Sequence, residues 1–509
     1  MIRITGSTLH IPSYTLQQIA LHWRAWAKRA GWGSRATFPL ILAATIASGI
    51  IVASVAATFQ PLVAAALIVA VLILARFVTQ PFYALLLTMV FIPMDALDDY
   101  FPGGLSAAKL LTLVTIACFA VYWLISAEDR RLLRGTQSKL ILAFLAAGLV
   151  SSFLADYPAQ SFNTLFRFFR LALLYLVVHN LADTPNRTRW LIIVLLATIS
   201  ISALYGLDSY LASPLKNFRA EGLTRQPNKL GFDAALMAPI AIALLLSTRS
   251  RLGRVLLAAA SGLLIVGVII SFSRGSAIAL VACLPLLVWR LGSRHRVRVL
   301  ITLAVLAAII VPLIPTRFYD RFSTLGESGA DFSLMRRETY LLFGQQKLLE
   351  QPWIGIGLSN FEEQYAQSEY RILLAEDELT KGRPAHNTYM HIAAETGLVG
   401  LGLFLSLVFV SWRDLRRSQE GFRLRGDIAT FRLAQGLEIS FLCFLILCLF
   451  SSRQYEEFPW LIFALSGLLA RCARNSRDPA SSEAKDESIH ALTAHAAGGA
   501  SVPGPAHRA

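Results

Sequence analysis

Arginines and one histidine at the edges of apolar segments are the residues of this sequence whose types and positions could do chemistry. His386 lies in "RPAHNTYMH", just before an apolar segment, and Arg274 lies in "SFSRGSA", between two apolar segments. Arg219 and Arg225 lie in "RAEGLTRQPNKLG", which also leads into an apolar segment. Arginine is always charged and binds phosphate oxygens through parallel hydrogen bonds, whereas histidine can take up a proton near neutral pH. The pattern predicts a site where arginines bind an anionic group such as a diphosphate and His386 acts as a general base.

Each of these residues also has a purely structural interpretation. A single arginine at a membrane interface often extends to phospholipid headgroups, and a histidine before a helix can cap it. Arg274 has little freedom to extend because its turn is short, which favours a function. His391 follows five residues after His386, a spacing that does not suit two metal ligands on one helical face, and we interpret it as structural. Second-rank candidates for lining the same cavity are Arg167 and Arg170, which could instead pair with carboxylates, and Arg383.

The composition indicates a membrane protein. Of the 509 residues, 55% are hydrophobic and only 16% are charged, whereas soluble domains carry about 25% charged residues. The net charge of +15 could indicate nucleic-acid binding, but in a membrane protein it follows from Lys and Arg in cytoplasmic loops. We therefore expect membrane lipids, and no nucleic acid, among the partners. The five cysteines lie in or beside apolar stretches without zinc-like spacing, and no metal site is predicted.

Apolar stretches predict an all-α polytopic membrane protein with about 12–14 transmembrane helices, since about 20 mostly apolar residues cross a bilayer. The predicted order is a cytoplasmic amphipathic segment at 1–36, transmembrane helices 1–11 at 37–314, a large periplasmic loop at 315–387, the C-terminal transmembrane helices at 388–472 and a disordered cytoplasmic tail at 473–509. Patterned, aromatic segments inside the large loop predict helices that lie at the membrane surface. The candidate stretches are 37–58, 61–79, 81–97, 106–126, 139–155, 162–182, 189–211, 230–247, 253–271, 275–291, 297–314, 388–412, 432–450 and 459–472.

The distribution of arginines predicts the orientation in the membrane. Loops such as "EDRRLLRGTQSK" and "WRDLRRSQEGFRLR" alternate with loops such as "DALDDYFPGG" and "ADYPAQS", which contain no Lys or Arg. Because positively charged loops stay in the cytoplasm, both termini are predicted to be cytoplasmic in a bacterial inner membrane. Arg219, Arg274 and the loop 315–387 break this pattern on the periplasmic side. We therefore expect the active site there.

Three motifs resemble, in order and spacing, those of the bacterial O-antigen ligase and O-antigen polymerase superfamily. They are "RAEGLTRQPNKLG", "SFSRGSAIAL", and "EQPWIGIGLSNF" followed by "AHNTYMHIAAETGLVG". The resemblance covers residues from about 200 to 410 and extends to the other spans through topology alone. It implies a GT-C-like membrane glycosyltransferase that takes a glycan from undecaprenyl diphosphate in the periplasmic leaflet, without a metal or cofactor. It also implies that Arg219 and Arg274 lie near the diphosphate and that His386 is the base. Arg225 is a less secure match, because the first motif holds two arginines.

The acceptor separates two activities within this superfamily. Ligases transfer the glycan to the lipid A core of lipopolysaccharide, and polymerases of O-antigen or exopolysaccharide transfer it to another repeat unit. The motifs are shared and do not distinguish them. A single attack on the anomeric carbon, with the diphosphate as leaving group, predicts inversion of configuration.

Two other classes of protein remain as alternatives. A polysaccharide transporter or flippase would also have many spans and intramembrane charges, but internal repeats are expected there, and none is evident. A non-catalytic scaffold of an export complex would not need Arg274 and His386 together.

Overall fold

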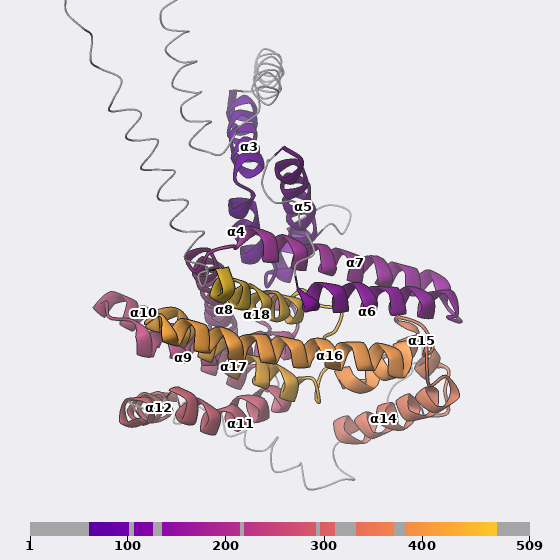
Figure 1. Ribbon diagram of the computed structural model, residues 1–509. Helices are drawn as coiled ribbons and strands as arrows, with labels where there is room; N and C mark the ends of the chain where they lie inside the picture. Colours follow the sequence, from indigo (N-terminus) through magenta and orange to yellow (C-terminus); the bar gives the residue numbers. More distant parts are fainter. Residues whose placement is uncertain are drawn as a thin grey trace, which may run out of the picture. The chain divides into compact units, whose positions relative to one another are not determined.

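The regular secondary structure of the described part of the chain consists of helices alone, with no strand (Figure 1). The chain forms two compact units, a smaller one within residues 1–88 and 109–132 and a larger one within residues 89–108 and 133–509. The all-α class predicted from the sequence is confirmed. The computed structural model describes residues 61–100, 106–125, 135–213, 218–291, 296–310, 332–370 and 382–475.

The smaller unit is built from α3 (Pro61–Thr79), most of α4 (Pro81–Phe91) and most of α5 (Ala107–Ile125). The chain bends by 111° between the end of α3 and α4. The break falls where α4 begins with a proline, which disfavours a continuous helix through the residue before it. The hydroxyl groups of Thr88 and Thr115 lie 2.8 Å apart and join α4 to α5 within this unit.

The larger unit contains the remaining helices, and three of them begin with a proline. Proline suits the first helical position, because its missing N–H would have no partner there. The three are α7, α8 and α9. The helices of this unit are α6 (Thr136–Phe153), α7 (Pro158–Leu181), α8 (Pro185–Ala212), α9 (Pro227–Ser247), α10 (Arg251–Ile270), α11 (Arg274–Leu291), α12 (Arg296–Ile310), α14 (Phe332–Glu350), α15 (Asn360–Ala366), α16 (Thr388–Leu424), α17 (Ile428–Leu447) and α18 (Glu457–Asn475), with the short 3₁₀ turns η1 (Asp95–Tyr100) and η3 (Gly222–Thr224).

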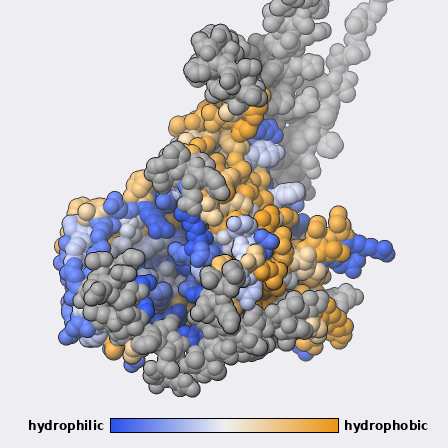
Figure 2. Space-filling model, turned by 180° about the vertical axis from the view of Figure 1, so that it is seen from behind, coloured by the Kyte–Doolittle hydropathy of each residue, from blue (hydrophilic) through white to orange (hydrophobic). Residues whose placement is uncertain are grey.

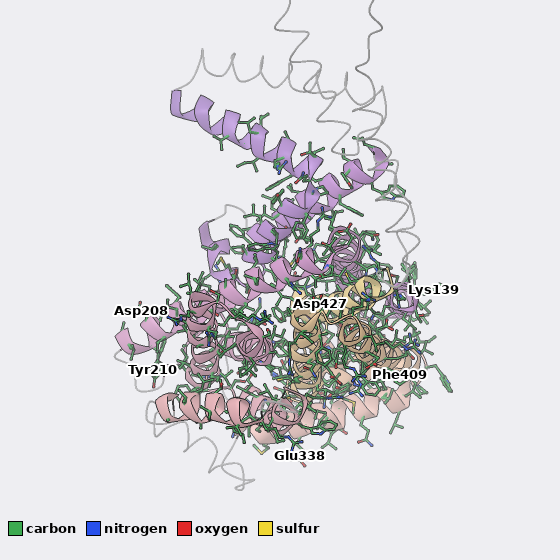
Figure 3. The ribbon with its side chains drawn as sticks, turned by 60° about the vertical axis from the view of Figure 1, so that its left-hand side comes forward. Lys139, Asp208, Tyr210, Glu338, Phe409 and Asp427 are labelled. Atoms are coloured by element: carbon green, nitrogen blue, oxygen red, sulfur yellow. The ribbon has the colours of Figure 1, made fainter. Side chains whose placement is uncertain are left out.

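Helices α9 and α17 form the centre of the larger unit and pack against each other. Their spans are 78% and 72% buried, the highest shares among the candidate spans of the described residues. Helices around them expose large apolar side chains, for example Leu204, Leu256 and Phe409, of which Phe409 is labelled in Figure 3. Apolar side chains on the outside suit contact with lipid, as the composition predicts.

Eight helices of the described residues are long and apolar enough to cross a membrane, or up to nine if the bent α3–α4 pair forms one span. Every stretch predicted from 61–79 to 459–472 overlaps a helix. The predicted stretch 37–58 and the segment 1–36 lie outside the described residues, as does the tail beyond residue 475. The polytopic class is confirmed, and the count of 12–14 spans stays a prediction.

The predicted loop 315–387 contains two helices in its described part, α14 and α15. Helix α14 packs beside α16 (Figure 1), and its Glu338, labelled in Figure 3, is exposed. The expectation that this loop forms helices is therefore met in the described part. Their position at a membrane surface stays a prediction.

Candidate functional site

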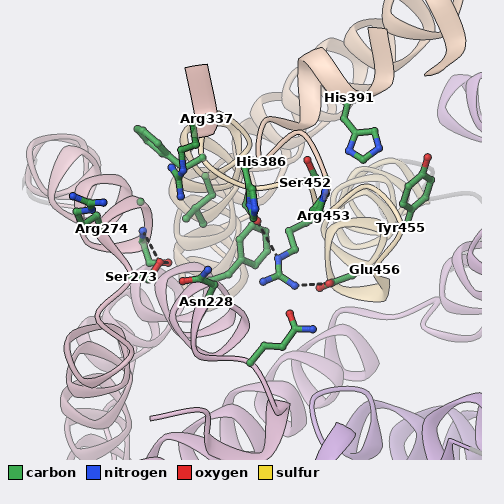
Figure 4. A pocket seen from close by; sticks show the side chains of 18 of the residues that line it. Asn228, Ser273, Arg274, Arg337, His386, His391, Ser452, Arg453, Tyr455 and Glu456 are labelled. Carbon is green, nitrogen blue, oxygen red and sulfur yellow. Dashed lines mark hydrogen bonds and ion pairs between the residues drawn. The ribbon is translucent and has the colours of Figure 1, made fainter. Parts of the chain in front are cut away.

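One cavity in the larger unit gathers residues from all three motifs singled out in the sequence. Its volume is about 320 Å³, and residues of α7, α9, α11, α14, α15 and α16 line it together with the α17–α18 connection (Figure 4). Arg219, Arg274 and His386 are all among the lining residues. The three residues that the sequence placed in the principal roles are thus brought together, although they are far apart in the chain.

Arg219 is fixed in place by two hydrogen bonds. Its Nε donates to the backbone carbonyl of Ser271 over 3.0 Å, and its Nη2 donates to Oδ1 of Asn228 over 2.7 Å. The neighbouring Ala220 N–H donates to the carbonyl of Ile270, also over 3.0 Å. The segment before α9 is therefore tied to the end of α10, where the "SFSRGSA" motif begins.

The "SFSRGSA" motif forms a turn that ends α10 and starts α11. Phe272 has a left-handed conformation with φ 49°, which reverses the chain. The Ser273 hydroxyl accepts a hydrogen bond from the N–H of Ser276, so it caps the start of α11. A side chain at Gly275 would lie 2.6 Å from Cβ of Phe450, and only glycine allows this close approach. The turn therefore brings Arg274 and the N-terminus of α11 to the cavity wall.

His386 lies just before the N-terminus of α16, and its backbone has a left-handed conformation with φ 51°. The next residue, Asn387, caps the helix: its Oδ1 accepts a hydrogen bond from the N–H of Met390 over 3.0 Å. The N–H of Thr388 donates to the carbonyl of Cys448 over 2.8 Å, which ties this end of α16 to the end of α17. Asn387, rather than His386, therefore caps the start of α16.

The surroundings of His386 hold its imidazole neutral. The pKa of His386 is lowered to about 4, chiefly by burial and in addition by the nearby cations Arg337, Arg453 and Arg383. Its ring lies 5.7 Å from the ring of Tyr340 on α14. A histidine with this pKa is neutral at physiological pH and can accept a proton.

His391 and Glu395 form a buried pair on the first turns of α16. Nε2 of His391 lies 3.0 Å from Oε1 of Glu395, and each side chain is 1% exposed. Glu395 also accepts hydrogen bonds from the N–H of Phe361 and from the hydroxyl of Tyr455. His391 lines the cavity (Figure 4), and its Nε2 is hydrogen-bonded to Glu395. Its structural role stays our interpretation.

A break in α16 positions this end of the helix. Gly397 interrupts the helical backbone with φ 65° and ψ −170°. The "PWIGIG" segment packs along the break, where Ile356 N–H donates to the carbonyl of Ala394 and Gly357 N–H donates to the carbonyl of Glu395, over 3.0 and 3.1 Å. The glycine-rich motif therefore satisfies backbone groups that the broken helix leaves open.

Two arginines that sequence reasoning did not single out also line the cavity (Figure 4). Arg337 lies on α14, and Arg453 lies in the short connection before α18. Arg453 is 7% exposed, donates to the hydroxyl of Ser451 over 3.0 Å and forms an ion pair with Glu456. Its signal in the sequence was the same as that of Arg274, a lone arginine in a short connection between two apolar segments.

The remaining candidates divide between the cavity and its surroundings. Arg167 lines the cavity. Arg170 forms an ion pair with Glu457 over 3.3 Å, so it pairs with a carboxylate, which was the alternative to lining the cavity. The second arginine of the first motif, Arg225, is exposed, has φ 57° and does not line the cavity. Arg383 does not line it either, although its charge contributes to the lowered pKa of His386.

The cavity is strongly positive. Its described lining carries five arginines and two glutamates, Glu362 and Glu456. No group of three or more His, Cys, Asp or Glu side chains that could hold a metal ion occurs within the part of the chain that the structure describes. Such a site suits an anion with more than one negative charge.

Comparison with known families agrees with the geometry. Residues 259–405 match the family model described as O-Antigen ligase. The chain carries an O-antigen ligase family domain. No curated protein matches the chain. This match confirms the resemblance to the O-antigen ligase superfamily over residues 259–405, and the eight candidate spans among the described residues indicate a multi-pass membrane protein.

The O-antigen ligase domain supplies only part of the cavity lining. It runs from within α10 to within α16 and includes Arg274, Arg337 and His386. Arg219 precedes the domain and Arg453 follows it. The site is therefore completed by residues on both sides of the matched segment.

Proposed function

We propose that the protein is an inner-membrane glycosyltransferase that moves a glycan from undecaprenyl diphosphate to an acceptor hydroxyl on the periplasmic side, with the lipid A core as acceptor. The observation that carries this proposal is the shared cavity of Arg219, Arg274 and His386. The O-antigen ligase family domain supports the class of reaction. The charge pattern of the loops supports the inner membrane, cytoplasmic termini and a periplasmic cavity.

The arginines would bind the diphosphate of the donor. Negative charge grows on the diphosphate as its bond to the anomeric carbon breaks, and fixed cations stabilise that charge more in the transition state than in the ground state. Arg219 is already oriented by Ser271 and Asn228 before any donor binds. This arrangement can supply the charge stabilisation that a divalent metal could otherwise give. We therefore propose a reaction that needs neither a metal nor a cofactor.

His386 would remove the proton of the acceptor hydroxyl. The acceptor oxygen bonds to the anomeric carbon while the bond from that carbon to the diphosphate oxygen breaks, and the proton passes to the imidazole. Attack from the face opposite the leaving group inverts the configuration. With a pKa of about 4, the imidazole is neutral but weakly basic in the free protein. The negative diphosphate would offset the arginines and raise this pKa when the donor binds.

The test is transfer by the purified protein in lipid bilayers. A radiolabelled glycan on undecaprenyl diphosphate is offered together with either lipid A core or a second lipid-linked glycan. We expect the label on the lipid A core and release of undecaprenyl diphosphate. Label on the second glycan alone would assign the protein as a repeat-unit polymerase. Movement of the intact donor across the bilayer without bond cleavage would refute the glycosyltransferase and favour a flippase.

A further inference from the structure

A second cavity of the larger unit, of about 410 Å³, lies between α14, the end of α15 and the residues before α7. It shares no lining residue with the arginine-rich cavity. Hydrophilic residues gather on the side of the larger unit that carries α14 and α15 (Figure 2). We call this cavity the α14–α15 groove and define it by Asp156, Tyr157, Gln346, Gln364, Gln367 and Tyr370.

The lining of the α14–α15 groove carries little net charge, because Lys347 stands against Asp156 and Glu369, and it suits uncharged polar ligands. It contains no arginine among its described residues, whereas the first cavity has five. Three glutamine side chains line it, and a side-chain amide can both donate and accept hydrogen bonds, as a sugar hydroxyl does. The rings of Tyr157 and Tyr370 add apolar surface with a polar tip, against which the C–H face of a sugar ring can pack. Aromatic rings with a few placed polar groups are typical of ligand sites.

The walls of the groove are held together by internal contacts. Asn360, which is fully buried, accepts a hydrogen bond from the N–H of Tyr157 over 2.8 Å. Gln364 donates to the carboxylate of Asp156 over 2.8 Å, and the rings of Phe343 and Tyr370 lie 6.2 Å apart. A site with fixed walls binds with less loss of conformational entropy.

The same two helices reach both cavities. Helix α14 contributes Arg337 to the arginine-rich cavity and Gln346 to the groove, and α15 contributes Glu362 to the first and Gln364 to the second. At 1.5 Å per residue, Arg337 and Gln346 are about 13 Å apart along the axis of α14. A ligand that reacts beside Arg337 in the first cavity and reaches the groove beside Gln346 must therefore span this distance, which is longer than one sugar unit.

We propose that the α14–α15 groove binds the saccharide chain of a substrate more than one sugar unit away from the reacting bond. This inference rests on the proposed function for the identity of the substrate, but not for the binding of saccharide. The chain can belong to the lipid-linked donor or to the glycan of the acceptor, since both offer hydroxyls and C–H faces. The groove makes the enzyme favour long glycans over short ones.

The first experiment measures occupancy without measuring transfer. A photo-crosslinking amino acid replaces Gln346 in one full-length variant and Gln345 in the other, because Gln345 is the neighbouring exposed glutamine of α14 that does not line the groove. Both are expressed in cells that make the lipid-linked glycan and in cells whose glycan assembly is blocked. We expect a glycan-stained ladder only from position 346 and only when glycan is made. Equal ladders from both positions, no ladder, or crosslinks to protein or lipid alone would overturn the proposal.

The second experiment assigns the chain to the donor or the acceptor. Gln346→Ala, Gln364→Ala and the control Gln345→Ala are compared with a lipid-diphosphate donor that carries one repeat unit and with one that carries many. We expect the two groove variants to raise KM for the long donor roughly three- to tenfold, the effect of one lost hydrogen bond, and to leave kcat and the short donor unchanged. A rise in KM for the acceptor instead would assign the groove to the acceptor glycan. Unchanged KM for both substrates would overturn the proposal.

The outcomes separate this inference from the proposed function. Absence of transfer by the unaltered protein would refute the proposed function, while the crosslinking result would still decide whether the groove binds saccharide. Transfer with no dependence on Gln346 and Gln364, and no crosslink at position 346, would leave the proposed function in place and refute the groove.

Discussion

Arg219 and Ser271 are joined by a hydrogen bond of 3.0 Å from the guanidinium Nε to the backbone carbonyl. This bond places Arg219 beside the turn that carries Arg274, and both arginines line the same cavity. The Nε–H and one Nη2–H of the Arg219 guanidinium are thus used to orient the side chain. Position 219 therefore requires the planar shape of a guanidinium as well as its positive charge, because a lysine ammonium cannot donate the same set of directed hydrogen bonds.

Substitution of Arg219 should lower transfer strongly. We expect Arg219→Ala to reduce kcat by roughly 10²–10³-fold, as removal of one preorganised donor at a developing charge does. Arg219→Lys should recover only part of this loss. The matched control is Arg225→Ala in the same motif, which should retain full activity because Arg225 lies outside the cavity. Transfer from a labelled lipid-diphosphate donor measures all three, and equal losses at positions 219 and 225 would contradict the assignment.

Removal of the imidazole at position 386 should slow the chemical step. We expect His386→Ala to reduce kcat by roughly 10²–10⁴-fold, the range for loss of a general base, while donor binding is largely retained. His391→Ala should reduce the rate much less, because His391 is engaged with Glu395. Donor binding is measured separately with the labelled lipid. A His386→Ala protein at full rate, or equal losses at the two histidines, would return His386 to a structural role.

The pH dependence should report the environment of His386. The pKa of His386 is depressed to about 4, and the neutral form is the active one, so kcat/KM should be constant above that pH and fall as pH drops through it. Arg337 is the nearby cation with the largest effect on this pKa. Arg337→Gln removes a positive charge and should move the acidic limb to higher pH.

The donor-bound state should differ from the free protein. Because the diphosphate is negative, the acidic limb of kcat should lie at higher pH than the limb of kcat/KM. Profiles of both constants for the unaltered protein and for Arg337→Gln provide the measurement. A limb that shifts to lower pH in Arg337→Gln would be inconsistent with His386 as the titrating group.

The glycine at position 355 should be needed for the stability of the α16 break. A side chain there would lie 2.4 Å from the carbonyl carbon of Glu395, and the residue has φ 75°. We expect Gly355→Ala to destabilise the protein by about 3 kcal/mol through overpacking and backbone strain, with a lower Tm in detergent. The matched control is Gly402→Ala on α16, where an added Cβ meets no atom within 4 Å. That variant should keep its Tm or gain slightly from helix propensity.

Transfer should survive removal of divalent cations. The described residues contain no group of three metal-binding side chains, whereas five arginines line the cavity. We expect unchanged kcat in EDTA. Loss of activity in EDTA that Mg²⁺ or Mn²⁺ restores would show that a metal, rather than arginine, stabilises the leaving diphosphate.

The sequence alone determined the class of protein and the principal candidates. Apolar stretches of the length of a bilayer specify helices by themselves, because every backbone polar group in lipid must be satisfied within its own segment. Arg274 and His386 could be singled out because a charge beside an apolar span is costly wherever the chain folds. Asn387 could be expected as a helix cap, because capping depends only on neighbouring residues.

Only the tertiary structure decided which arginines share the cavity. Arg219 and Arg225 lie six residues apart in one motif, and Arg219 enters the cavity because it bonds to Ser271 at the end of a different helix. Arg337 and Arg453 come from other elements and join the same cavity. Such convergence depends on contacts between residues that are distant along the chain. Local patterns of charge and hydropathy contain no information on these contacts, because each reports only on a residue and its sequence neighbours.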